Sequence, residues 1–105
     1  MKGYFYRLIP PRPTFSSDMS PEEGAVMGAH FKYWSTLMKE GKVLAFGPVG
    51  APTGGYGFAI LTVENGDEAA ALRDNDPAVL SPHGFKTDLD PIMALVTASG
   101  TLIAT

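Results

Sequence analysis

Cysteine is absent from this sequence, and charged residues make up only 18% of its 105 positions. Without cysteine the chain can form no disulfide, no thiolate metal site and no cysteine nucleophile. Lysine and arginine number 8 against 11 acidic residues, so the chain lacks the basic surplus that nucleic acid or an anionic membrane attracts. It also lacks a signal-peptide core and an apolar run long enough to cross a bilayer. We expect a cytoplasmic protein with no nucleic-acid or membrane partner.

The length and the 45% content of hydrophobic residues are those of one ordinary globular domain. We place this domain at residues 1–98. Residues 99–105 form a C-terminal tail, which we expect to be either an additional strand or a dangling end.

The 12 glycines and 9 prolines divide the chain into short segments. A capping box at Ser20-Pro21-Glu22-Glu23 predicts a helix that runs to about Glu40 and stops at Gly41. A second helix is predicted over residues 65–75, ended by Asp76-Pro77. Three prolines in four positions predict an extended arm without helix over residues 10–18. Apolar runs predict strands at 4–9, 43–46 and 56–63, and a last strand over 85–97 that Pro91 interrupts or places at an edge.

The predicted order is β-α-β-β-α-β, the split pattern of an α+β ferredoxin-like fold. Such a fold places both helices on one face of a four-stranded antiparallel sheet. The other face is left uncovered, although Tyr, Phe, Ile and Val alternate along the strands. We therefore expect a homodimer through the open face of the sheet.

His30 occupies an unusual position on the first predicted helix. At 100° per residue it lies in the middle of the apolar stripe, where leucine would be expected. It is either a core histidine satisfied by one carbonyl or water, or an acid–base group that points into a cavity between helix and sheet. Asp76 has two readings as well: the Asp-Pro pair is a simple helix stop, or its carboxylate orients His30 through a ring N–H.

Five further residues are candidates for substrate binding. Arg7 lies on a strand, on the same face as Phe5 and opposite Tyr4 and Tyr6, and is either a surface residue or a carboxylate anchor. The same alternatives hold for Arg12 and Thr14 in the arm. Tyr33 and Trp34 are either core residues or a substrate contact.

Metal and cofactor sites are poorly supported. His30, Asp76 and His83 could supply metal ligands, but they show no ligand spacing, and we expect His83 to be exposed in a loop. The glycines of residues 47–57 match no nucleotide-binding fingerprint. We expect no metal and no cofactor.

Several short motifs, in order and spacing, resemble the YciI-like (YCII-related) family, specifically a subgroup with a Pro-Pro-Arg-Pro-Thr-Phe arm. The resemblance extends from Tyr4 to about Val96. Its motifs are Leu8–Phe15, Asp18-Met19-Ser20, His30 with Tyr33-Trp34, Gly41-Lys42-Val43, Phe46–Val49, Tyr56-Gly57, Asp76-Pro77 and Pro91-Ile92-Met93.

This resemblance implies a dimeric α+β barrel, in which two ferredoxin-like sheets face each other. It also implies an active site built on a helix histidine and an aspartate, positions matched here by His30 and Asp76. A dehydrochlorinase of chlorinated hydroxyquinols and muconolactone isomerase belong to the same superfamily. Some family members carry a further aspartate near the end of the first helix, where this chain has Lys39.

Two functions remain open at this point. The first is a cofactor-independent enzyme of lyase or isomerase type acting on an anionic or aromatic small molecule. His30 would be its general acid or base, Asp76 would orient the ring, and Arg7 or Arg12 would hold the substrate. The second is a non-catalytic dimeric module that binds a small ligand or a partner, in which His30 is structural.

Overall fold

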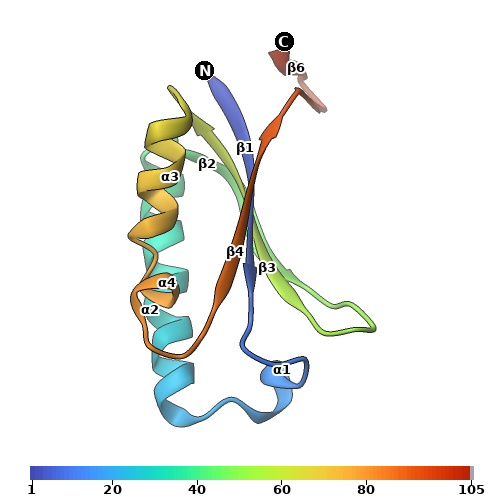
Figure 1. Ribbon diagram of the computed structural model, residues 1–105. Helices are drawn as coiled ribbons and strands as arrows, with labels where there is room; N and C mark the ends of the chain where they lie inside the picture. The colour runs from blue at the N-terminus through green and yellow to red at the C-terminus, as the bar shows by residue number, and fades with distance from the viewer. Residues whose placement is uncertain (105) are drawn as a thin grey trace.

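Four strands form one antiparallel sheet in the computed structural model, which describes residues 1–104 (Figure 1). The strands lie in the order β2-β3-β1-β4, so the two central strands are β1 and β3. This arrangement and the helices between the strands confirm the predicted ferredoxin-like α+β fold. The strand bounds are β1 Lys2–Ile9, β2 Val43–Val49, β3 Tyr56–Val63 and β4 Lys86–Ile92.

The two longer helices begin at the caps that the sequence predicts. Helix α2 spans Pro21–Lys39, and the Ser20 hydroxyl accepts a hydrogen bond from the Glu23 amide while the Glu23 carboxylate accepts one from the Ser20 amide. Gly41 follows with a φ of 81°, which suits a glycine stop. Helix α3 spans Gly66–Asp74 and starts at Asn65, whose side chain accepts from the Glu68 amide.

The hydrophobic core lies between these helices and one face of the sheet. Alternation along β1 directs Tyr6 and Leu8 to this face. Helices α2 and α3 and the one-turn helix α4 (Pro77–Leu80) all cover it (Figure 1). The buried residues that form this cluster are Tyr6, Leu8, Trp34, Leu37, Val43, Ala59, Leu61, Val63, Ala69 and Ala78.

No helix covers the other face of the sheet within residues 1–104 (Figure 1). Phe5 and Phe58 stack there with their ring centroids 6.1 Å apart. Arg7 lies beside them and donates a hydrogen bond to Asp88 on β4. We call this surface the open face.

One local prediction was wrong and another was incomplete. Residues Phe15–Asp18 form a helical turn, α1, inside the segment predicted to be extended without helix. The last proline of the arm is Pro13. The amides of Ser17 and Asp18 can therefore donate to the Thr14 carbonyl. Asp76-Pro77 ends α3 as predicted, but it also starts α4, because Asp76 is the N-cap of that helix and Pro77 its first residue.

The C-terminal part of the chain departs from the sheet. Strand β4 continues through Pro91 at the sheet edge, where a missing amide is tolerated. Strands β5 (Ala94–Thr97) and β6 (Gly100–Ala104) then form a separate hairpin, and Ile103 packs against Gly3. Of the two alternatives for the tail, the additional strand is the one observed. None of the helices in residues 1–104 is long and apolar enough to span a membrane.

Candidate active site around His30 and Asp76

His30 and Asp76 meet between α2 and the segment that joins α3 to α4. His30 lies one turn before Trp34 on α2, so both side chains point to the same side of the helix. The imidazole Nδ1 is 2.9 Å from each carboxylate oxygen of Asp76. The structure therefore brings together the two residues predicted to form a pair.

The Asp76 carboxylate is fully buried and accepts hydrogen bonds from four donors. The Tyr6 hydroxyl donates to Oδ2 over 2.7 Å and the Trp34 indole N–H over 2.8 Å. The Ala78 amide donates to Oδ1 over 2.9 Å, as expected at a helix N-cap. With the His30 ring as the fourth donor, strand β1, helix α2 and the start of α4 all hold one carboxylate in place.

These donors favour the ionised form of the carboxyl group. Burial alone would raise the pKa of Asp76, but the hydrogen bonds from His30, Trp34 and the Ala78 amide hold it below its ordinary value. Burial raises the pKa of the Tyr6 hydroxyl far above its ordinary value, and the nearby Asp76 charge adds to that effect. Tyr6 therefore stays protonated and remains a donor to an ionised Asp76.

The second nitrogen of His30 has no hydrogen-bond partner within residues 1–104. A carboxylate can only accept hydrogen bonds, so the Nδ1 of His30 must carry the proton that it donates to Asp76. In the neutral ring the lone pair is then on Nε2. No group in residues 1–104 makes a hydrogen bond to Nε2, and the imidazole side chain is 17% exposed.

Tyr33 and Trp34, both predicted to contact substrate, lie close to this pair: the Trp34 ring contacts the rings of His30 and Tyr33. Trp34 is buried, and its indole N–H is used by Asp76, so it positions the carboxylate. The Tyr33 hydroxyl donates to the Leu72 carbonyl over 2.6 Å, and its burial, together with the charge of Asp76, raises its pKa to about 12. The substrate contacts of both residues remain predictions.

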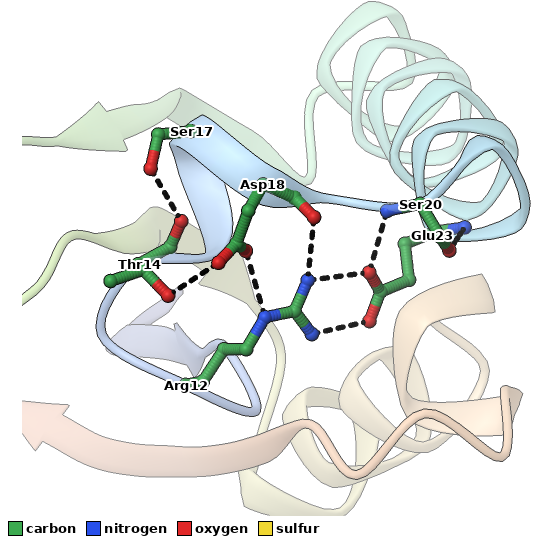
Figure 2. Close-up of polar contacts among 6 residues, drawn as sticks. All are labelled: Arg12, Thr14, Ser17, Asp18, Ser20 and Glu23. Carbon is green, nitrogen blue, oxygen red and sulfur yellow. Dashed lines mark hydrogen bonds and ion pairs between the residues drawn. The ribbon is translucent and has the colours of Figure 1, made fainter.

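Arg12 and Thr14 belong to a different cluster, at the start of α2 (Figure 2). The Arg12 guanidinium donates to both carboxylate oxygens of Glu23 and to the carboxylate and carbonyl of Asp18. The Thr14 hydroxyl donates to the second Asp18 oxygen. The hydrogen bonds from Arg12 and Ser20 lower the pKa of Glu23 to about 2. This cluster fastens the proline arm to α2, away from His30.

Arg7 is also apart from His30, because it lies on the open face. It forms an ion pair with Asp88 over 2.7 Å, and its guanidinium carbon lies 5.2 Å from the centre of the Tyr56 ring. A cleft of about 330 Å³ lies beside Arg7, between the proline arm and the loop before β3. Its walls are Arg7, Ile9, Pro10, Pro11, Arg12, Pro13, Thr53, Gly54, Gly55 and Tyr56, and neither His30 nor Asp76 is among them.

Sequence reasoning missed Tyr6 as a member of the site. The signal was present, since a tyrosine on the buried face of a central strand needs a partner for its hydroxyl. His83, predicted to be exposed, is partly buried in the loop between α4 and β4. No group of three or more His, Cys, Asp or Glu side chains in residues 1–104 is arranged to hold a metal ion.

The fold and the buried pair define a small α+β domain with a carboxylate–histidine site between its helices and its sheet. Residues 4–89 match the family model of the YCII-related domain, which is most of the chain. The chain thus belongs to the YCII-related domain family, and the resemblance noted from its motifs is confirmed. A search of the curated proteins found no match to the sequence.

Proposed function

We propose that the protein is a cofactor-independent enzyme that moves a proton on a small molecule, with His30 as the general acid–base group. One observation carries the proposal: the His30 ring donates through Nδ1 to a carboxylate held by three other donors, and its Nε2 has no partner in residues 1–104. A purely structural histidine needs no such support. General acid–base help of this kind is worth about 10²–10⁴-fold in rate.

The arrangement supports a simple cycle of proton transfer. His30 Nε2 accepts a proton from a C–H next to a carbonyl, or from a hydroxyl, and the ring becomes an imidazolium. Asp76 stabilises that cation through Nδ1 and does not itself take up the proton, because its other donors favour the carboxylate. The imidazolium then returns the proton to another atom of the substrate, as in an isomerase, or to a departing group, as in a lyase.

The predicted substrate class is a small anionic or aromatic molecule. Arg7 and Arg12 were predicted to hold the anionic group, and both now have carboxylate partners: Asp88 for the first, Asp18 and Glu23 for the second. Arg7 donates one hydrogen bond to Asp88 and keeps further N–H groups for an anionic group. It lies on the open face, so an anion bound by Arg7 would occupy the cleft beside it and not the space next to His30.

The tautomer of His30 tests the proposal directly. Long-range ¹⁵N–¹H NMR spectra of the whole protein at pH 8 should show the proton on Nδ1 and a bare Nε2. The variant Asp76→Asn should lose this preference, whereas Asp74→Asn, two residues away and exposed, should keep it. A wild-type ring with its proton on Nε2 would contradict the proposal.

A second experiment measures the chemistry without knowledge of the substrate. A panel of small carbonyl compounds in D₂O is incubated with the protein, and ¹H NMR follows the loss of the protons next to the carbonyl. Exchange by wild type should fall to the buffer rate in His30→Gln and be unchanged in His83→Gln. Exchange that survives in His30→Gln at the wild-type rate would overturn the proposed role.

The alternative, a small-ligand-binding module without catalysis, draws support from the cleft beside Arg7. Its proline and tyrosine walls could hold a flat apolar ligand without any contact to His30. Chemical shift changes from bound fragments distinguish the two functions. If the protein is the proposed enzyme, the shifts should change at His30 and at Gly57, which lies beside the imidazole. If it is a binding module, they should change only at Tyr56 and Gly54, in the cleft beside Arg7.

The proposal includes a homodimer through the open face. The stacked pair Phe5 and Phe58 and the neighbouring Ile60 give this face an apolar centre that is only partly buried in one chain. A second copy of the sheet would cover it and complete the dimeric barrel that the family resemblance implies. Sedimentation equilibrium at micromolar concentration should give twice the chain mass, and a monomer there would contradict this part of the proposal.

A further inference from the structure

From Leu61 toward His30, the side chains on the inner face of β3 become smaller. The residues of this strand that face the helices are Val63, Leu61, Ala59 and Gly57, in order from the C-terminal end of β3 to the end beside His30. The residues that alternate with them on the open face do not shrink: they include Ile60, Phe58 and Tyr56. Volume is therefore missing on one face only, at the end of the strand beside the imidazole.

The backbone does not require a glycine at position 57. Gly57 is absent from the residues with positive φ, so other side chains can adopt its conformation. It lies inside β3 and pairs with Leu8, and glycine weakens the interior of a strand. A residue that costs stability and is not needed for the backbone calls for another explanation.

Close packing does not require the glycine either. A Cβ built at Gly57 would lie 3.7 Å from Leu8 Cβ, 4.0 Å from the Gly47 carbonyl oxygen and 4.0 Å from His30 Nε2. All three are ordinary van der Waals distances, and none of these atoms is helix backbone. An alanine would therefore fit, and its methyl group would lie against the free nitrogen of His30.

We propose that Gly57 is the size-determining residue of the site: it keeps open the space in front of His30 Nε2 into which the reacting group of the substrate enters. The inference rests on the proposed function, since it assumes that Nε2 acts on a bound molecule. The two other atoms nearest this space are a carbonyl oxygen and a methylene carbon, and neither is cationic. The reacting group that fits here is compact and uncharged, such as a hydroxyl or a C–H next to a carbonyl. The charged part of a substrate would lie elsewhere.

Acylation by diethyl pyrocarbonate tests this inference without a known substrate, because the reagent attacks an unprotonated, accessible imidazole nitrogen. Mass spectrometry of peptides from the intact, folded protein gives separate rates for His30 and His83. Gly57→Ala should slow the labelling of His30, and Gly57→Val should slow it further, by about tenfold, which corresponds to about 1.4 kcal/mol of added barrier. The rate at His83 should not change in either variant.

Gly47→Ala is the matched control. Gly47 also lies inside a strand, without positive φ, but a Cβ there would point to the open face, 3.8 Å from the Phe58 ring. This variant should label at the wild-type rate at both histidines. Urea unfolding of each variant shows whether the fold is retained, and Gly57→Ala should unfold at the wild-type concentration or above it. If Val at this position prevents folding, the Ala variant still decides the question.

The outcomes separate this inference from the proposed function. Equal labelling of His30 in wild type, Gly57→Ala and Gly47→Ala would overturn the role of Gly57 and leave the acid–base role of His30 intact. Slowing by Gly47→Ala as large as that by Gly57→Ala would also overturn it, because the effect would then come from strand glycines in general. A wild-type His30 that does not react, while His83 does, would overturn the acid–base role itself.

Discussion

Two buried carboxylates, Asp76 and Glu23, solve the same physical problem in different ways. The Asp76 side chain is 0% exposed and the Glu23 side chain 8% exposed, so each needs donors to remain ionised. Glu23 takes them from the Arg12 guanidinium and from the backbone amide of Ser20. Asp76 takes them from two aromatic side chains, a backbone amide and an imidazole.

The difference lies in what the last donor can do next. Arginine keeps its proton at any ordinary pH, and Arg12 donates four hydrogen bonds to Glu23 and Asp18, so that cluster fastens the arm. Histidine has a second nitrogen, and on His30 that nitrogen has no partner in the described part of the chain. Glu23, which binds an arginine, therefore fastens the arm to α2, whereas Asp76, which binds a histidine, is part of a candidate reaction site.

The largest predicted effect comes from removing the charge of Asp76. In Asp76→Asn one carboxylate oxygen is replaced by an NH2 group, which is itself a donor, so either Tyr6 and Trp34 or the Ala78 amide lose their acceptor inside the core. Leaving buried donors without acceptors costs about 1–3 kcal/mol each, so we expect a loss of about 2–4 kcal/mol in the free energy of unfolding by urea. Asp74→Asn, whose side chain is mostly exposed, should change it by less than about 0.5 kcal/mol. Equal effects of the two substitutions would show that the four-donor arrangement is not a stabilising feature.

A smaller effect is expected when one donor to Asp76 is removed. Tyr6→Phe keeps the ring and leaves Asp76 with His30, Trp34 and the Ala78 amide, so it should cost about 1 kcal/mol. It should also move acid unfolding to higher pH. The folded-state pKa of Asp76 is depressed, so the stability it contributes is present above the unfolded value and is lost as pH falls. Losing a donor raises the folded-state pKa toward the unfolded value, so Asp76 contributes less stability above this window, and the less stable variant reaches its acid midpoint at a higher pH.

Tyr33→Phe is the control for this experiment. Like Tyr6→Phe, this substitution removes one partly or fully buried tyrosine hydroxyl. The Tyr33 hydroxyl, however, donates to the Leu72 carbonyl and not to Asp76. Circular dichroism followed from pH 6 down to pH 2 compares the two variants. An acid midpoint that moves equally in both would mean that Tyr6 does not act through the carboxylate.

The comparison also shows what the sequence can and cannot predict. Helix periodicity is local, and it was enough to place His30 in the apolar stripe of α2 and to start that helix at Ser20. The pairing of His30 with Asp76 was a hypothesis from the Asp-Pro corner at the end of the second predicted helix, and the family resemblance implied the same pair. The other donors could not be derived, because Tyr6 and Asp76 are 70 positions apart and their contact depends on how β1, α2 and α4 pack together. The acid–base role of His30 and Asp76 is still a prediction.

The same limit explains the arm. The capping box of Glu23 is a local motif and was predicted, but its second partner, Arg12, comes from the segment with the prolines. That contact, together with the bonds from Arg12 and Thr14 to Asp18, holds the turn α1 that the proline count argued against. The local capping and helix-stop motifs thus identified each carboxylate. Only the packed structure shows which donors form hydrogen bonds to it.

The smallest effect is expected at Glu23, and it has a distinct pH dependence. Its pKa of about 2 in the folded protein lies below the ordinary value of 4.5, chiefly because of the hydrogen bonds from Arg12. The stability that Glu23 contributes is therefore present above pH 4.5 and is lost between pH 4.5 and about 2. Glu23→Gln should reduce the pH dependence of the free energy of unfolding by urea over this window. At pH 7 it should lower that free energy less than Asp76→Asn does, because Arg12 is partly exposed and solvent screens the ion pair. Glu22→Gln, exposed in the same helical turn, should keep the wild-type slope. If Glu23→Gln also abolished the His30-dependent exchange in D₂O, the two carboxylates would be coupled, and the division into a fastening and a reaction site would fail.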